Sequence, residues 1–210
     1  MQRNLYAQTF RALPGDFLSP VEYSALDQGA HVIQFLDMLD INYICPGNHE
    51  FDFGMDVYEQ RMAEYVGKDS AATPRRNIAS NFRGLKHSLP YDISVSPGGF
   101  RIGWISACVV KSTPKPHREL MTPEFAALQE TARLLKEEKQ VDLVVALTHL
   151  VVAEDKKVTT SVGLFAGEAG RTGKAGGREG WLEGWETRIV ARWVGCLPFS
   201  SQAKQPCCCR

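Results

Sequence analysis

The sequence predicts a layered α/β domain over residues 1–157. Amphipathic helical segments alternate with short apolar runs along this stretch, and such alternation is typical of sheets covered by helices. Apolar residues make up 44% of the 210-residue chain and charged residues 23%, as in globular proteins with one ordinary core. The net charge is zero. No basic surface for nucleic acid is therefore indicated, and binding of a nucleic-acid duplex is not expected.

Three segments have the spacing of amphipathic helices. Residues 29–39 place apolar side chains on one broad face, and residues 56–66 form a second helical segment. Residues 122–139 form the third and longest one. We expect Thr122 to cap this helix and Pro123 to occupy its first position, because these residue types favour those places.

Three apolar runs outside these helices predict strands, at residues 41–45, 101–106 and 141–148. The last run is apolar almost throughout, which is typical of a strand buried on both faces. Residues 10–14 are the only candidates for an earlier strand, and they have little apolar character.

The composition changes near residue 157. Residues 158–210 hold nine of the eighteen glycines and seven Lys or Arg against four Glu, with a net charge of +3. A glycine-rich run of this kind buries too little side chain to offset its ordering entropy. We therefore divide the chain into a domain at 1–157 and an irregular tail at 158–210. Only residues 187–194 of the tail have the composition of a short helix or strand.

Cysteine and hydropathy patterns add further expectations. Four of the six cysteines lie in the last fifteen residues, whereas Cys45 and Cys108 lie in apolar runs and are expected to be buried free thiols. No membrane span is predicted, because no apolar run reaches the length that a span requires. No secretory signal is visible, which makes the cytoplasm the default compartment, although a truncated N-terminus would also lack such a signal. The oligomeric state is left open.

Polar residues follow three of the predicted strands. Asp16 follows the weak strand at 10–14, Asn48 follows residues 41–45, and His149 ends the strand at 141–148. Ligands bind at the carboxyl ends of strands in α/β sheets, so we expect these three side chains to converge. Such a mixed donor set suits Zn²⁺, Mn²⁺ or Fe better than Ca²⁺. Taken singly, Asp16 and His149 are explained as well by an ordinary loop carboxylate and a hydrogen-bonded structural histidine.

The segment 47–52, Gly-Asn-His-Glu-Phe-Asp, concentrates an amide, an imidazole and two carboxylates within six residues. Asp52 lies three residues after His49 and can hold its imidazole in one tautomer. The second ring nitrogen is then left to donate to a phosphoryl oxygen or to protonate a leaving group. For Glu50 we expect a role in loop structure.

This segment resembles the signature of the calcineurin-like metallophosphoesterases, and its Phe-Asp continuation resembles the 5′-nucleotidase branch. Residues 15–20, 77–82 and 146–149 resemble further motifs of that branch in the same order, so the resemblance covers about residues 12–157. It implies a layered sandwich and a hydrolase of phosphoric esters, with nucleotides or other small phosphoesters as substrates. In that family, two divalent ions (Zn, Mn, Fe or Mg) share a bridging aspartate, and a metal-activated hydroxide attacks phosphorus.

The resemblance also implies roles for individual residues. Asp16 matches the bridging metal ligand, and Asn48 and His149 match ligands of the second metal. His49 and Asp52 match the catalytic pair, in which the imidazole stabilises the transition state or leaving group and the carboxylate orients it.

Two motifs of the family are absent from the sequence. No Asp-x-His pair precedes Gly15, and no histidine follows His149, where Gly-His-x-His is expected. We therefore expect an incomplete catalytic domain that holds one metal ion rather than two, followed by a tail that is not native to the family. The alternative is a non-catalytic protein that acts as an interaction or single-metal-binding module.

Overall fold

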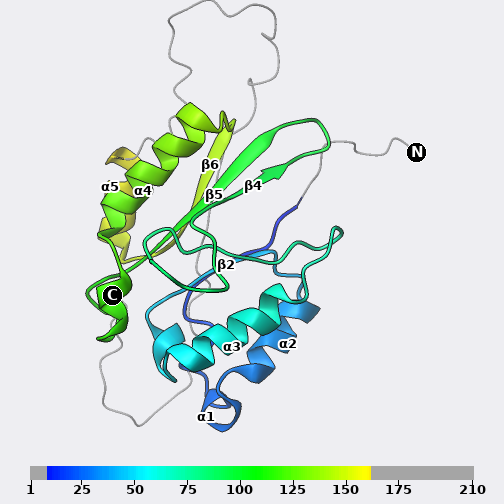
Figure 1. Cartoon of the computed structure of the whole chain (residues 1–210), viewed down its shortest axis with the longest axis vertical. Helices are drawn as coiled ribbons and strands as arrows, with labels where there is room; N and C mark the ends of the chain where they lie inside the picture. Colours follow the sequence, from blue (N-terminus) through cyan, green and yellow to red (C-terminus); the bar gives the residue numbers. More distant parts are fainter. Residues whose placement is uncertain (1–8, 162–210) are drawn as a thin grey trace, which may run out of the picture.

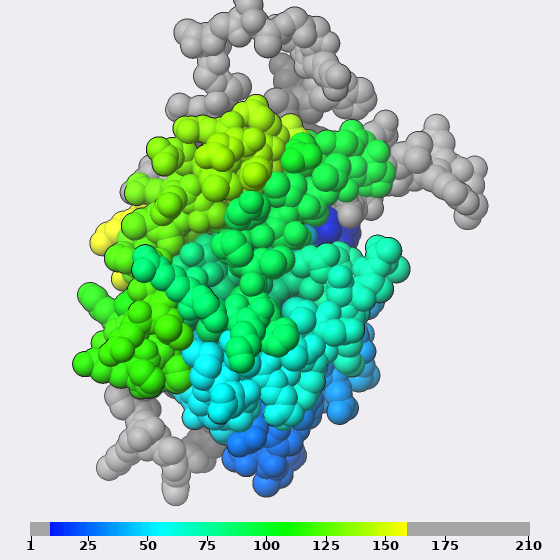
Figure 2. Space-filling view, viewed as in Figure 1, coloured from blue at the N-terminus to red at the C-terminus, as the bar shows by residue number. Residues whose placement is uncertain are grey.

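The structure, a computed structural model, describes residues 9–161, with side chains placed as far as residue 158. Two three-stranded sheets pack face to face, and helices cover the outer side of each sheet (Figure 1). The first and second halves of the described chain, coloured blue to cyan and green to yellow, occupy adjoining parts of one surface (Figure 2).

The first sheet is parallel and has the order β1-β2-β3. Its strands are β1 (Ala12–Pro14), β2 (Tyr43–Cys45) and β3 (Arg76–Asn77). The connections between them carry α1 (Ser24–Asp27), α2 (Ala30–Met38), the 3₁₀ turn η1 (His49–Phe51) and α3 (Met55–Val66). All three strands therefore present their carboxyl ends at the same edge of the sheet.

The second sheet has the order β4-β5-β6. Strand β4 (Asp92–Val95) is antiparallel to β5 (Arg101–Cys108), and β5 is parallel to β6 (Leu143–His149). The crossover from β5 to β6 contains the 3₁₀ turn η2 (His117–Leu120), α4 (Glu124–Arg133) and the π-helical turn η3 (Leu134–Glu138). Helix α5 (Val152–Ser161) follows β6.

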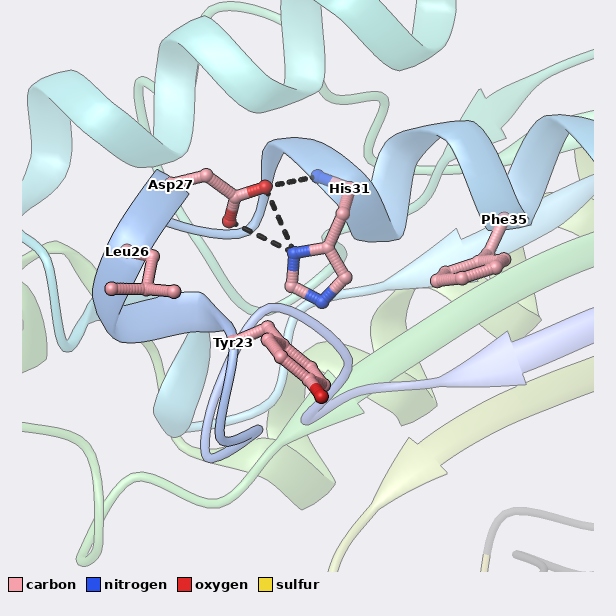
Figure 3. Close-up of a pocket in the computed structure, with 5 residues that line it drawn as sticks. All are labelled: Tyr23, Leu26, Asp27, His31 and Phe35. Atoms are coloured by element: carbon pink, nitrogen blue, oxygen red, sulfur yellow. Dashed lines mark hydrogen bonds and ion pairs between the residues drawn. The ribbon is translucent and has the colours of Figure 1, made fainter.

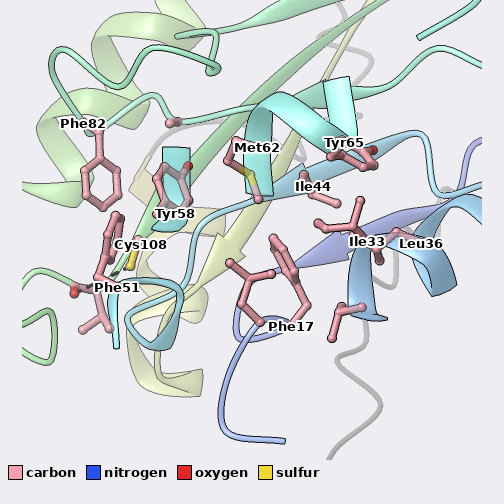
Figure 4. Close-up of a cluster of buried hydrophobic side chains, with 14 residues drawn as sticks. Phe17, Ile33, Leu36, Ile44, Phe51, Tyr58, Met62, Tyr65, Phe82 and Cys108 are labelled. Atoms are coloured by element: carbon pink, nitrogen blue, oxygen red, sulfur yellow. Dashed lines mark hydrogen bonds between the residues drawn. The ribbon is translucent and has the colours of Figure 1, made fainter. Parts of the chain in front are cut away.

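Side-chain alternation along the strands builds three apolar layers. On β2, Ile44 packs on α2 and α3 in the cluster shown in Figure 4, whereas Tyr43 and Cys45 face the second sheet. On β5, Trp104 faces the first sheet and stacks on Tyr43 with ring centroids 4.0 Å apart, while Ile105 points to α4 and α5. A strand has a side-chain period of two, so each central strand contributes to two layers.

The predicted helices and strands are confirmed within the first 157 residues, with small shifts at their ends. The cap of the third helix was predicted wrongly. Thr122 donates its N–H and its hydroxyl to the carbonyl of Asn81, at 2.9 and 3.4 Å, and Pro123 occupies the N-cap position. A contact with a distant loop thus competes with local capping. Within the described part of the chain, Cys45 and Cys108 are buried free thiols, as predicted.

The predicted division at residue 157 falls inside a helix. Helix α5 continues through it, and the side chain of Val158 is 2% exposed in the layer between α4 and the second sheet. The segment 187–194 lies outside the described residues, so the character of the tail stays a prediction. Between residues 9 and 161, no helix combines the length and hydropathy that crossing a bilayer requires.

Close packing between β5 and the crossover helix depends on Gly103. A Cβ atom at this position would lie 2.8 Å from Leu135 Cδ1 and 3.3 Å from Val141 Cγ2. We expect Gly103→Ala to lower the free energy of unfolding by about 1–3 kcal/mol, as overpacked cores do. Gly98→Ala is the matched control, because the nearest atom to its Cβ would be 3.9 Å away. Urea denaturation of both variants checks this, and equal midpoints would contradict it.

Candidate active site

Three of the predicted site residues meet where the two sheets adjoin. Asp16 follows β1, His49 follows β2, and His149 ends β6. The Nε2 atom of His149 lies 3.1 Å from Asp16 Oδ2, and the backbone N–H of His49 donates to Asp16 Oδ1 at 3.0 Å. The carboxylate of Asp16 is therefore shared between a loop of the first sheet and the last strand of the second.

Two glycines permit this close approach. Gly15 has φ +77°, and a Cβ there would lie 2.7 Å from both Gly47 Cα and His149 Nδ1. A Cβ on Gly47 would overlap Asp16 Oδ1 and the backbone N of Asp16. The glycines of the two motifs thus leave the space that the carboxylate and the imidazole occupy.

The buried side chain of Glu50 connects the loop after β1 with the loop after β2. Its side chain is 1% exposed. Oε1 accepts the backbone N–H groups of Phe17 and Leu18 at 2.6 and 3.0 Å, and Oε2 accepts those of Asp16 at 2.7 Å and of Gly47. The expected role of Glu50 in loop structure agrees with these contacts, because its carboxylate satisfies four backbone donors that have no ladder partner.

Two opposing influences act on the charge of Glu50. Burial, followed by the nearby carboxylate of Asp16, raises the pKa of Glu50 to about 7, although the backbone donors act in the lowering direction. The carboxylate is therefore ionised mainly at pH values above about 7.

The imidazole of His149 is held on both sides by acceptors. Nδ1 lies 3.1 Å from the carbonyl oxygen of Pro14, and Nε2 faces the carboxylate of Asp16. Burial disfavours the charged ring, but the hydrogen bond to Asp16 and the charge of that residue raise the pKa of His149 overall. A carbonyl and a carboxylate can only accept hydrogen bonds, so this position attracts a proton or another cation to Nε2.

His49 and Asp52 pair as the sequence suggested. Nδ1 of His49 lies 2.8 Å from Asp52 Oδ2, and the two side chains are 41% and 32% exposed. The same oxygen accepts the hydroxyl hydrogen of Ser19 at 2.7 Å. With Nδ1 bonded to the carboxylate, Nε2 is the ring nitrogen left for another partner.

The remaining predicted ligand is Asn48. Asn48 precedes His49 at the start of η1, and its side chain makes no hydrogen bond to a described residue. The described residues contain no cluster of three or more His, Cys, Asp and Glu side chains arranged to hold a metal ion. The side chain of Asn81 bonds the backbone N–H and carbonyl of Cys108 at 3.0 and 2.9 Å, which ties its loop to the end of β5.

Sequence reasoning missed two contacts of the site. The hydroxyl of Ser19 on Asp52 is one, and the ring of His117, stacked on Phe51 with centroids 5.0 Å apart, is the other. Both join residues that are far apart in the chain. The only local indication was that Ser19 belongs to the motif at 15–20.

A shallow pocket of about 320 Å³ lies on α1 and α2, away from these residues (Figure 3). Tyr23 and Phe35 flank the ring of His31, whose Nδ1 lies 2.8 Å from Asp27 Oδ1. This histidine therefore has a local partner and no contact with the site at the strand ends.

The loop geometry provides a stability test at pH 8. Replacing Glu50 by Gln turns one acceptor oxygen into an NH₂ group that faces two backbone donors. We expect Glu50→Gln to lower the free energy of unfolding by at least about 2 kcal/mol, because buried donors lose their acceptors. The exposed Glu119 makes no side-chain hydrogen bond to described residues, so Glu119→Gln is the control. Equal unfolding midpoints for the two variants in urea would refute the structural role of Glu50.

Comparison with known proteins supports the assignment of the fold. No family model matches the sequence. The snake venom 5′-nucleotidase of Gloydius brevicauda is 28% identical over 155 residues, which covers 70% of this chain and 26% of that protein. The snake venom 5′-nucleotidase of Crotalus adamanteus is 29% identical over 142 residues, covering 64% and 23%. The chain spans about a quarter of the length of these relatives.

Solved structures of 5′-nucleotidase-type proteins have a similar fold. The NAD nucleotidase of Haemophilus influenzae superposes with a TM-score of 0.60 at 20% identity, over 71% of this chain and 30% of that one. A 5′-nucleotidase precursor from Thermus thermophilus superposes with a TM-score of 0.60 at 22% identity, over 71% and 29%. At these identities the match concerns the fold. The described chain therefore has the fold of the metallophosphoesterase domain of 5′-nucleotidases.

Proposed function

We propose that the site binds one divalent cation at Asp16 and His149 and serves the hydrolysis of phosphoric esters, with nucleotides as the favoured substrates. The observation that carries this proposal is the environment of the His149 ring. Its Nδ1 faces a backbone carbonyl, and its Nε2 faces a carboxylate at 3.1 Å. Metal-binding histidines commonly donate one ring N–H to a carbonyl, which leaves the other nitrogen for the ion.

The donors present fit a single ion better than a pair. Asp16 supplies oxygen, His149 supplies nitrogen, and Asn48, next to the His49 N–H that bonds Asp16, would supply the amide oxygen. Asp, Asn and His suit Zn²⁺, Mn²⁺, Fe or Mg²⁺. Such an ion would act as a Lewis acid on a phosphoryl oxygen and on water.

The remaining side chains would act on the substrate. The side chain of His49 is 41% exposed, its Nδ1 atom is bonded to Asp52, and its Nε2 atom has no hydrogen bond to a described residue. This nitrogen can donate to a phosphoryl oxygen or protonate a leaving alkoxide. Nucleotides are favoured because both sequence relatives are 5′-nucleotidases.

Metal binding tests the proposal directly. We expect the chain to bind Mn²⁺ with a stoichiometry near one in isothermal titration calorimetry. Asp16→Asn and His149→Gln should each weaken binding by more than about tenfold, since loss of even an outer partner of a ligand costs 10–100-fold. Among the described residues, His87 forms hydrogen bonds only through its backbone, so His87→Ala is the control. Unchanged Mn²⁺ affinity in both ligand variants would exclude this site.

Turnover distinguishes an enzyme from a binding module. With Mn²⁺ and an aryl phosphate we expect His49→Ala to lower kcat by about 10²–10⁴-fold, which is the usual contribution of acid–base catalysis. His87→Ala should retain the wild-type rate. A folded chain that binds Mn²⁺ without any turnover would instead support the alternative, a non-catalytic module that binds a single metal ion.

A further inference from the structure

One carboxylate oxygen of Asp52 accepts two hydrogen bonds from different parts of the chain. The hydroxyl of Ser19 donates to Oδ2 at 2.7 Å, and His49 Nδ1 lies 2.8 Å from the same atom. No other hydrogen bond to a described residue involves the Asp52 side chain. The hydroxyl of Ser19 is therefore the anchor of this carboxylate outside its own turn.

The two partners of Asp52 differ in how firmly they are held. The side chains of His49 and Asp52 are 41% and 32% exposed and lie three residues apart on one short turn. An exposed pair of this kind contributes little order by itself. Ser19 is 6% exposed and follows directly on the segment whose N–H groups bind the carboxylate of Glu50. The backbone that leads to its hydroxyl is thus anchored by a buried carboxylate.

We propose that Ser19 is a positioning residue for His49: its hydroxyl holds Asp52, and Asp52 holds the imidazole as the Nδ1–H tautomer. A catalytic benefit of this arrangement rests on the proposed function, because Nε2 of His49 contacts a substrate only if the site hydrolyses phosphoesters. The positioning itself is a property of the folded chain.

The same contacts also fix the position of the His49 imidazole relative to Asp16. Residues 16–19 carry the proposed metal ligand at one end and the hydroxyl that holds Asp52 at the other. The backbone N–H of His49 bonds Asp16 Oδ1 directly. The imidazole is therefore tied to this loop at two points, through its own backbone and through Asp52. Reacting groups gain most when their separation is set before the substrate binds.

Ring nitrogen shifts test the proposal without metal or turnover. In ¹⁵N NMR of the full chain at pH 8, with His49 identified by its loss in His49→Gln, we expect one dominant Nδ1–H pattern. Ser19→Ala should replace it by the averaged pattern of an unconstrained imidazole. Ser24→Ala is the control, since the buried Ser24 hydroxyl has no hydrogen-bond partner among described residues. An unchanged His49 pattern in Ser19→Ala would overturn the proposal.

Two further variants distinguish the effect of losing the Ser19 hydroxyl from an effect on folding. Ser19→Thr keeps a hydroxyl and should keep the Nδ1–H pattern, whereas Ser19→Cys keeps the approximate volume with a weaker donor and should lose it. If Ser19→Ala fails to fold, the Cys variant decides, and a retained Nδ1–H pattern there refutes the role. If Ser19→Ala changes the His49 ring pattern but the chain does not bind Mn²⁺, the positioning role of Ser19 is supported. Only the proposed function is then rejected.

Discussion

Four backbone N–H groups from two loops converge on the buried carboxylate of Glu50, and the arrangement of the site depends on this contact. The donors belong to residues 16–18 and to Gly47, which are the segments that carry Asp16 and His49. Loops at strand ends have no ladder to satisfy their donors, so a buried acceptor must replace it. Without such an acceptor these loops would need water inside the core or would open.

The layered packing explains why the loops lie side by side. Alternate residues of β2, β5 and β6 face opposite layers, so the sheets dock through Tyr43, Trp104 and Leu147 while their outer faces hold the helices. This docking brings the end of β6 next to the end of β1. His149 thereby reaches a carboxylate that lies more than a hundred residues earlier in the chain.

Much of the fold and part of the site could be predicted from the sequence. Periodicity located the helices and the longer strands, and residues 47–52 identified the pair of His49 and Asp52, because their contact is local. The cap of α4 was predicted wrongly, since Thr122 bonds Asn81 across 41 residues. The hydroxyl of Ser19 on Asp52 was missed for the same reason. Strand β1 has little apolar character, and its place is set by pairing with β2 rather than by its own composition.

The contact between Asp16 and His149 has a mechanical consequence, because one residue follows the first sheet and the other ends the second. It links two layers that also pack against each other through apolar side chains. A ligand held by both residues would strengthen the link between the sheets. It would stabilise the whole sandwich in proportion to the logarithm of its concentration. Occupancy of the site and resistance of the fold to heat would then rise together.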